Sequence, residues 1–268
     1  MTRLAILAGQ GSLPQRIAAA HPDALFVHFE GVAVDLPANP AQSASFEKFG
    51  QMFDDLHRAG VHDVVFAGGL ARPALDPARF DAKMAQLAPG FMAAMAGGDD
   101  GLLRAVIAAF EAEGFTVCGA HELLAGLTAE PGLLAGPDPA PLDLADASRA
   151  RAILTALGPL DVGQGVVVAD GQCLGVETAQ GTDAMLSFVA RTPDVLRHRA
   201  RGVLFKAPKP GQDLRIDMPT IGPATVAAAG AAGLAGIVIA AGVVLLLDRE
   251  ETLQMATATG LFIMAQAA

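Results

Sequence analysis

The chain has 268 residues, of which 52% are hydrophobic, and a formal net charge of −10. This length allows two domains of ordinary size, and the apolar fraction is ample for their cores. The negative charge argues against nucleic acid as a partner, because nucleic-acid binding needs a basic surface. The two cysteines, Cys118 and Cys173, each lie alone in an apolar run, which indicates buried thiols in a reducing compartment.

The N-terminal half of the sequence alternates predicted strands with predicted helices. The strands are expected over 3–8, 24–29, 63–67 and 115–119, and the helices over 14–20, 45–59 and 97–113, the last capped by Asp99 or Asp100. This alternation predicts a Rossmann-like, mainly parallel, doubly wound sheet. Ligands bind beyond the carboxyl ends of such strands, which here are followed by 9–12 and 68–72.

Residues 131–141 are rich in proline and glycine and are interpreted as a linker. The linker separates an N-terminal domain, 1–130, from a C-terminal α/β catalytic domain, 142–268. The elements expected in the second domain are a helix over 143–157, a hairpin over 165–177 turning at Asp170 and Gly171, a helix from Gly181 capped by Thr182 or Asp183, and a strand over 202–206. Glu177, at the end of the hairpin, is expected to be solvated.

The run from Thr225 to Leu247 contains no charged residue and is long enough to span a bilayer. Glycines interrupt it, and 237–239 and 243–247 are rich in β-branched and leucine residues. These features favour a buried helix, a turn and two core strands over a membrane span. The N-terminal residues lack the pattern of a secretory signal, so we expect a soluble chain.

Several glycine-containing turns could bind a phosphate, but each could also be an ordinary turn without a ligand. Gly9, Gly11 and Pro14 resemble a dinucleotide fingerprint that lacks its third glycine. A phosphate at the following helix N-terminus and a tight strand-to-helix turn explain this pattern about equally well. Gly69 with Arg72 also fits a turn followed by a surface arginine.

The segment from Lys206 to Pro223 concentrates charge in a chain that is only 17% charged. Its prolines and glycines exclude a regular helix or a central strand. Three cations and two carboxylates lie close together in it: Lys206, Lys209, Arg215, Asp213 and Asp217. Cations hold phosphoryl oxygens, while carboxylates bind a metal or take a proton from water, so the segment indicates phosphate chemistry.

Asp217 is the preferred candidate within this segment, since it lies between Ile216 and Met218 just before a proline. The structural alternatives are an ion pair with Arg215 or a cap for a helix that begins near Thr220. The sequence contains no Gly-x-Ser-x-Gly, P-loop or Cys-x-x-Cys motif, and its histidines lack the pattern of a dinuclear metallophosphoesterase.

Along essentially its whole length, the chain resembles the LpxI-type UDP-2,3-diacylglucosamine pyrophosphatases of lipid A synthesis. The resemblance rests on 7–14, 98–104, 177–185, 209–222, 233–237 and 247–249. Among these, the sequence Asp217-Met-Pro-Thr-Ile-Gly222 is the most specific.

The resemblance implies an Mg²⁺-dependent hydrolase with two domains and the ligand between them. Water would attack the sugar-side phosphorus and release UMP and 2,3-diacylglucosamine 1-phosphate. Asp217 would be the catalytic carboxylate and metal ligand, with Asp213 as second choice and Lys206 as the third catalytic residue. The other implied substrate-binding residues are Gly9, Gly11, Ser12, Leu13, Gly69, Arg72, Asp99, Asp100, Thr182, Asp183, Lys209, Gln212, Arg215 and Thr220.

Two alternatives come from other functional classes. One is a nucleotide-sugar oxidoreductase that binds a dinucleotide at the Gly9 loop, and the other is a non-enzymatic glycolipid or nucleotide carrier. With the preferred assignment, we expect a cytoplasmic protein that contacts the inner-membrane surface transiently through its glycolipid substrate. A homodimer is compatible with the sequence.

Overall fold

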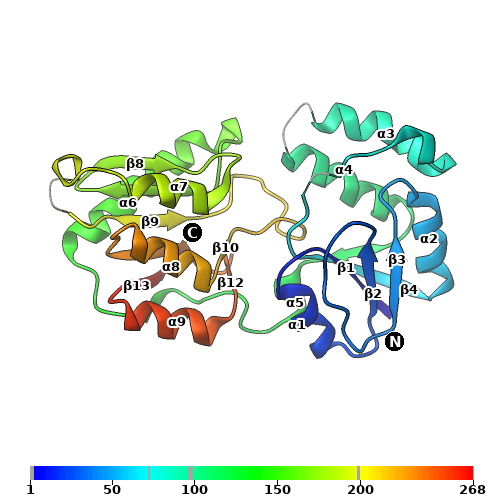
Figure 1. The fold of residues 1–268 in the computed structure, drawn as a ribbon, viewed down its shortest axis with the longest axis horizontal. Coiled ribbons are helices and arrows are strands. Elements are labelled where there is room, and N and C mark those ends of the chain that lie inside the picture. Colours follow the sequence, from blue (N-terminus) through cyan, green and yellow to red (C-terminus); the bar gives the residue numbers. More distant parts are fainter. Residues whose placement is uncertain (1–2, 72, 96–98, 198–199, 268) are drawn as a thin grey trace. The chain divides into compact units, whose positions relative to one another are not determined.

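The computed structural model describes residues 3–71, 73–95, 99–197 and 200–267. The chain forms two compact units, each with its own sheet (Figure 1). Unit 1 contains Met1–Ala125 and Asp213–Asp217, and unit 2 contains Gly126–Gln212 and Met218–Ala268. A short segment from the second half of the sequence therefore belongs to unit 1, although both of its flanks belong to unit 2.

Within the described residues, unit 1 has a five-stranded parallel sheet with the strand order β3-β2-β1-β4-β5. The strands are β1 (Arg3–Ala8), β2 (Leu25–Phe29), β3 (Ala41–Ala44), β4 (Val61–Ala67) and β5 (Thr116–Cys118). This order confirms the Rossmann-like prediction. The edge strand β3 was not predicted, because its sequence Ala-Gln-Ser-Ala contains no β-branched or aromatic residue.

The helices of unit 1 are α1 (Leu13–Ala20), α2 (Phe49–Arg58), α3 (Ala82–Met95), α4 (Asp99–Ala112) and α5 (Ala120–Leu123), with a 3-10 turn over Pro77–Arg79. Helix α2 begins later than predicted. The reason is local: the Ser45 hydroxyl donates to Glu47 Oε2 at 2.6 Å, and the Lys48 N–H bonds the Ser45 carbonyl at 3.1 Å. Such short-range bonds compete with helix formation.

The expected caps of α4 are not found where they were predicted. Asp99 and Asp100 both lie inside the helix, and the residues that precede Asp99 fall outside the described part of the chain. The Asp100 carboxylate pairs with Arg104 one turn later, at 2.8 Å. An acid in the first turn favours the helix through its dipole rather than by capping it.

Phe110 of α4 is fully buried in the core that residues of the unit 1 sheet and of helices α2, α3 and α4 form. Its ring is 5.0 Å from Phe53, 5.2 Å from Phe66 and 5.9 Å from Phe115, measured between centroids. These edge-on and tilted contacts are favourable geometries for aromatic pairs.

We expect Phe110→Ala to lower the free energy of unfolding of unit 1 by about 3–5 kcal/mol, because it removes a fully buried ring and leaves a cavity. Denaturant titration with a probe of unit 1, such as hydrogen exchange of β1 and β4, measures the change. Phe188→Ala is the control, since Phe188 is 60% exposed. An equal loss of stability in both variants would contradict the position of Phe110 in the core.

Unit 2 has, among the residues described, a six-stranded mixed sheet with the order β6-β13-β11-β9-β7-β8. Its strands are β6 (Gly132–Ala135), β7 (Gly165–Ala169), β8 (Gln172–Val176), β9 (Val203–Lys206), β11 (Gly236–Ala240) and β13 (Phe262–Gln266), while β10 (Thr220–Ile221) and β12 (Leu245–Leu246) form a separate parallel pair. The helices are α6 (Pro141–Leu157), α7 (Gly181–Val189), α8 (Pro223–Ala231) and α9 (Arg249–Ala258), with 3-10 turns over Gly158–Leu160 and Asp194–Leu196.

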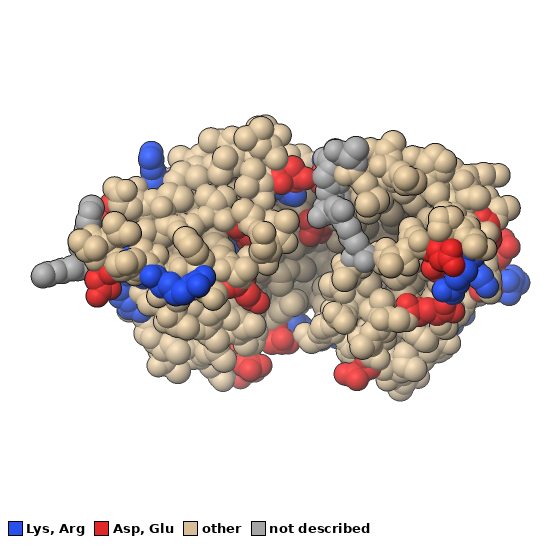
Figure 2. All heavy atoms as spheres, turned by 45° about the horizontal axis from the view of Figure 1, so that its top comes forward, with Lys and Arg blue, Asp and Glu red and all other residues tan. Residues whose placement is uncertain are grey.

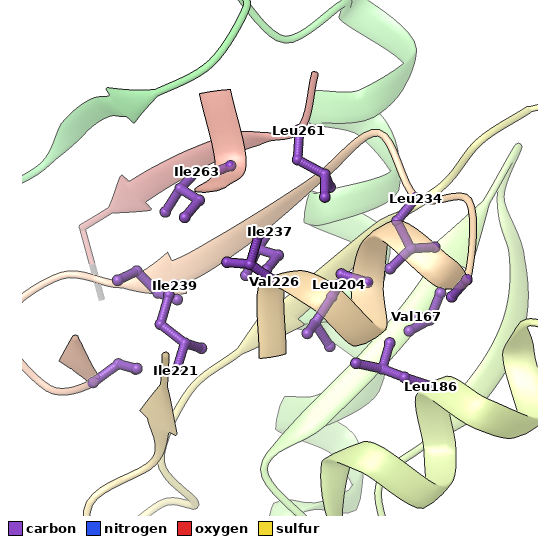
Figure 3. Packing of buried hydrophobic residues seen from close by; sticks show 14 of the residues in the cluster. Val167, Leu186, Leu204, Ile221, Val226, Leu234, Ile237, Ile239, Leu261 and Ile263 are labelled. Carbon is purple, nitrogen blue, oxygen red and sulfur yellow. The ribbon is translucent and has the colours of Figure 1, made fainter. Parts of the chain in front are cut away.

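Helices cover both faces of this sheet. The core on one face contains residues of α7, α8 and α9, and the core on the other contains residues of α6. Figure 3 shows Leu204 of β9 and Ile237 of β11 directed toward Val226 of α8. The expected hairpin is confirmed: Asp170 and Gly171 both have positive φ, and their N–H groups donate to the buried Asp146 of α6 at 2.9 and 2.8 Å.

The structure also bears on the expected linker and on the uncharged run. The segment interpreted as a linker contains β6, which pairs with β13 as an edge strand of the sheet. The uncharged run folds as α8, β11 and β12, as expected, and no helix in the described residues is long and apolar enough to cross a membrane.

The two cysteines differ in their exposure to solvent. The prediction of two buried thiols is wrong for Cys173, which is exposed on the edge strand β8, while Cys118 is half-buried. On the face drawn in Figure 2, acidic and basic side chains occur in small groups within a mostly uncharged surface.

Candidate functional site

Lys206 lies buried at the carboxyl end of β9 and is the centre of a polar cluster in unit 2. Its ammonium donates to Thr182 Oγ1 at 2.7 Å and to the Thr220 carbonyl at 3.0 Å. Glu177 Oε2 lies 3.8 Å from the same nitrogen. Because the Lys206 side chain is only 7% exposed, these oxygens replace most of the water that an ammonium needs. The cluster brings together three of the predicted residues, Lys206, Thr182 and Thr220.

Glu177 was wrongly expected to be solvated, since its side chain is only 12% exposed. Glu177 follows β8 directly, and its N–H donates to the Gly165 carbonyl of β7 at 2.8 Å. Gly165 in turn pairs with Lys206 on the neighbouring strand β9. A Cβ on Gly165 would lie 2.6 Å from Glu177 Oε2. Glycine therefore leaves the room that the carboxylate occupies beside the ammonium.

Among the described residues, Glu177 Oε2 has no hydrogen-bond partner, although it is buried. A buried carboxylate oxygen in this state is costly unless a cation lies near it, and Lys206 is that cation. The sequence contains both residues that bring these groups together, Gly165 and the lysine that ends β9. Their pairing depends on a strand order that the sequence did not predict, so the contact could not be recognised from the sequence.

The second lysine of the charged segment also has an acidic partner. Lys209 Nζ forms an ion pair with Asp161, which was not a predicted site residue, and the Lys209 N–H donates to Gln212 Oε1 at 2.9 Å. The Lys209 side chain is 13% exposed. Gln212 thus fixes the backbone of the loop, and Asp161 orients the ammonium.

The segment Asp213–Asp217 lies in unit 1 and is bound by a chain of charges. The Arg215 guanidinium donates to Asp213 from Nε at 3.0 Å and from Nη2 at 2.7 Å, and its Nη1 donates to Glu111 Oε1 at 2.7 Å. Hydrogen bonds from Arg215 hold the pKa of Asp213 below its usual range. The bonds to Asp213 and then to Glu111 raise the pKa of Arg215. The Asp213 side chain is therefore ionised at neutral pH, and both of its oxygens accept hydrogen bonds from Arg215.

Asp217 closes the segment. Its N–H donates to the Asp213 carbonyl at 3.3 Å, and the preceding Ile216 packs against the apolar core of unit 1. This long bond closes a loose turn from Asp213 to Asp217. The predicted roles of both carboxylates in catalysis stay predictions.

The glycine turns of unit 1 have a backbone reason for their composition. Gln10 and Gly69 exchange two backbone hydrogen bonds, at 2.8 and 2.9 Å, which join the loops after β1 and β4. A Cβ on Gly9 would lie 2.6 Å from the Gly69 carbonyl oxygen, and Gly68 has φ of +88°. Close approach of the two loops accounts for Gly9 and Gly68, and the predicted binding roles of Gly9, Gly11 and Gly69 stay predictions.

The remaining predicted residues lie at scattered positions. Gly11 and Ser12 are exposed after β1, whereas Leu13 is buried in the core at the start of α1. Asp183 is exposed in the first turn of α7, whose N-cap is Gln180, so neither Thr182 nor Asp183 is the expected cap. Arg72 falls outside the described residues.

Family models match the two halves of the sequence. The LpxI N-terminal domain matches residues 3–127, and the LpxI C-terminal domain matches residues 130–264. The chain belongs to the LpxI family. A Caulobacter vibrioides relative, the UDP-2,3-diacylglucosamine pyrophosphatase LpxI, is 41% identical, with 98% of this chain and 97% of the relative covered. Among solved structures, CobK precorrin-6A reductase is 17% identical with a TM-score of 0.34, covering 100% of this chain and 89% of that one.

The described residues limit how a metal could be held. In the described part of this LpxI chain, no group of three or more histidine, cysteine or acidic side chains gathers in a way that could hold a metal ion. Magnesium commonly takes only one or two carboxylates and completes its shell with water and substrate phosphates. A single carboxylate such as Asp217 fits a magnesium site of this kind, in which water and substrate phosphates supply the other ligands.

Proposed function

We propose that this protein hydrolyses the pyrophosphate bond of UDP-2,3-diacylglucosamine to UMP and 2,3-diacylglucosamine 1-phosphate. The observation that carries the proposal is the full-length match to the Caulobacter vibrioides pyrophosphatase. The buried ammonium of Lys206 supports it, because a cation with fixed oxygen partners and little water around it binds a phosphoryl oxygen strongly.

The reaction in this proposal is a displacement by water. The water oxygen bonds to the sugar-side phosphorus, and the bond from this phosphorus to the bridging oxygen breaks. UMP leaves with the bridging oxygen, and one proton is released to Asp217 or to solvent. Lys206 and Lys209 would neutralise the diphosphate, with Lys209 exchanging its contact with Asp161 for a phosphate oxygen.

Magnesium is part of the proposal as a cofactor. Asp217 would hold it together with oxygens of the substrate diphosphate, and the bound ion would supply charge neutralisation at the phosphoryl group. Asp213 is the less suitable ligand, since Arg215 already occupies its oxygens.

The bilayer enters the proposal through the substrate. Two acyl chains cannot remain exposed to water, so we propose that the protein acts at the cytoplasmic surface of the inner membrane as a peripheral protein in lipid A synthesis. Fractionation of the untagged protein tests this: release from membranes by high salt or carbonate is expected, and resistance to both would contradict it.

Hydrolysis in ¹⁸O-labelled water tests the reaction and the phosphorus that is attacked. We expect UMP without label and the sugar 1-phosphate with one ¹⁸O atom, both measured by mass. Label in UMP would place the attack on the uridine-side phosphorus. Absence of both products with Mg²⁺ present would overturn the proposed function itself.

A further inference from the structure

The segment Asp213–Asp217 is a five-residue insertion of the second half of the sequence into unit 1. Its backbone-to-backbone bonds are long: the N–H groups of Ile216 and Asp217 reach the Asp213 carbonyl at 3.4 and 3.3 Å, whereas the Arg215 N–H bonds the Asp213 side chain at 3.0 Å. The first two distances lie beyond the usual range for N–H···O bonds. The contacts that hold the segment must therefore come mainly from its side chains.

Side-chain contacts of two kinds connect the segment with described residues of unit 1. One is apolar, since Ile216 packs against the core. The other is the Arg215 guanidinium, which binds Asp213 with two nitrogens and Glu111 of α4 with a third. A planar guanidinium fixed by two carboxylates is restricted in direction as well as in position. Glu111 is thus a direct polar link from the segment to a helix of unit 1.

Helix α4 presents alternating charges on the face that carries Glu111. Asp100, Arg104 and Glu111 are spaced by four and seven residues, which places them along one side of a helix. The charge of Arg104 acts on Asp213 and helps to lower its pKa, and Glu111 binds Arg215. The order of charges on α4 therefore complements the order of charges on the segment.

We propose that Glu111 is a positioning residue, which through Arg215 holds the segment that carries Asp217 in its working place. The inference rests on the proposed function, because it assigns to Asp217 a role in hydrolysis. Glu111 itself needs no contact with substrate. Its contribution is to restrict the segment before substrate binds, because a misplacement of a reacting group by about 1 Å can cost about 100-fold in rate.

The test uses Glu111→Gln, which keeps the length of the side chain and removes its charge. Both partners are half-exposed, so the pair contributes little to global stability, and we expect the melting temperature to stay within about 1–2 °C. We expect kcat to fall about fivefold or more with KM changed less than twofold. Peptides covering 213–218 should exchange amide hydrogens faster than in the parent protein.

Glu113→Gln is the matched control. Glu113 follows α4 directly and forms its ion pair with Lys83 of α3, away from the segment. It should leave kcat and the exchange of 213–218 unchanged. The same two variants are then compared in an Arg215→Ala background, where Glu111→Gln should have no further effect on exchange, since its link to the segment is already lost.

Two results would overturn the inference. One is unchanged exchange over 213–218 in Glu111→Gln. The other is an equal effect of this substitution with and without Arg215. Hydrogen exchange needs no substrate, so it remains informative if the parent protein releases no UMP. In that case the proposed function fails, while faster exchange would still support the anchoring by Glu111.

Discussion

We expect Asp217→Asn to lower kcat for UDP-2,3-diacylglucosamine hydrolysis by at least about 100-fold, which corresponds to about 2.7 kcal/mol of barrier. The substitution keeps the shape of the side chain and removes the charge that the proposed metal and the attacking water require. The side chain lies in a partly exposed segment, so the melting temperature should change little. Steady-state UMP release and thermal melting measure the two effects.

Asp138→Asn is the control, because Asp138 is an exposed acid in the loop before α6. It should leave kcat unchanged. A fall of less than about tenfold for Asp217→Asn, with the melting temperature preserved, would mean that Asp217 is not the catalytic carboxylate.

The second large effect is expected at Lys206. Replacement by methionine removes the cation that faces Glu177 and leaves a buried carboxylate without its neighbour. Breaking a buried pair in this way costs about 3–5 kcal/mol of folding free energy. We expect kcat/KM to fall by at least about 100-fold as well, since the proposed phosphate contact is lost.

A double variant separates the two effects. Glu177→Gln added to Lys206→Met removes the uncompensated charge and should recover most of the stability without recovering activity. Lys83→Met is the control for a partly exposed lysine with an acidic partner. If the double variant regained activity along with stability, the role of Lys206 would be structural only.

The fold could be predicted where the residues of a single strand, helix or turn specify that element by themselves. The apolar runs of β1, β2 and β4 and the Asp170-Gly171 turn each specify their structure locally. The strand β3 could not be predicted in this way, because it is an edge strand that depends on β2 for its hydrogen bonds. The late start of α2 depends on the Ser45 side chain rather than on helix propensity.

The site was predictable in its residue types more than in its contacts. The charged segment after Lys206 was recognised from the sequence, yet Glu177, Asp161 and Glu111 were not. Each of these acids lies near its cation only because of strand order or because a distant segment packs on α4. The placement of Asp213–Asp217 in unit 1 is likewise a long-range result, since both neighbours in sequence belong to unit 2.

Hydrolysis of UDP-2,3-diacylglucosamine is the activity that we propose for this LpxI-family chain. The most direct measurement incubates the purified parent protein and Asp217→Asn, at equal concentration and with Mg²⁺, with this substrate and quantifies both products by mass. We expect equimolar UMP and 2,3-diacylglucosamine 1-phosphate from the parent protein, and at least about 100-fold slower release from the variant. No UMP above the level without enzyme, or equal release by both proteins, would contradict it.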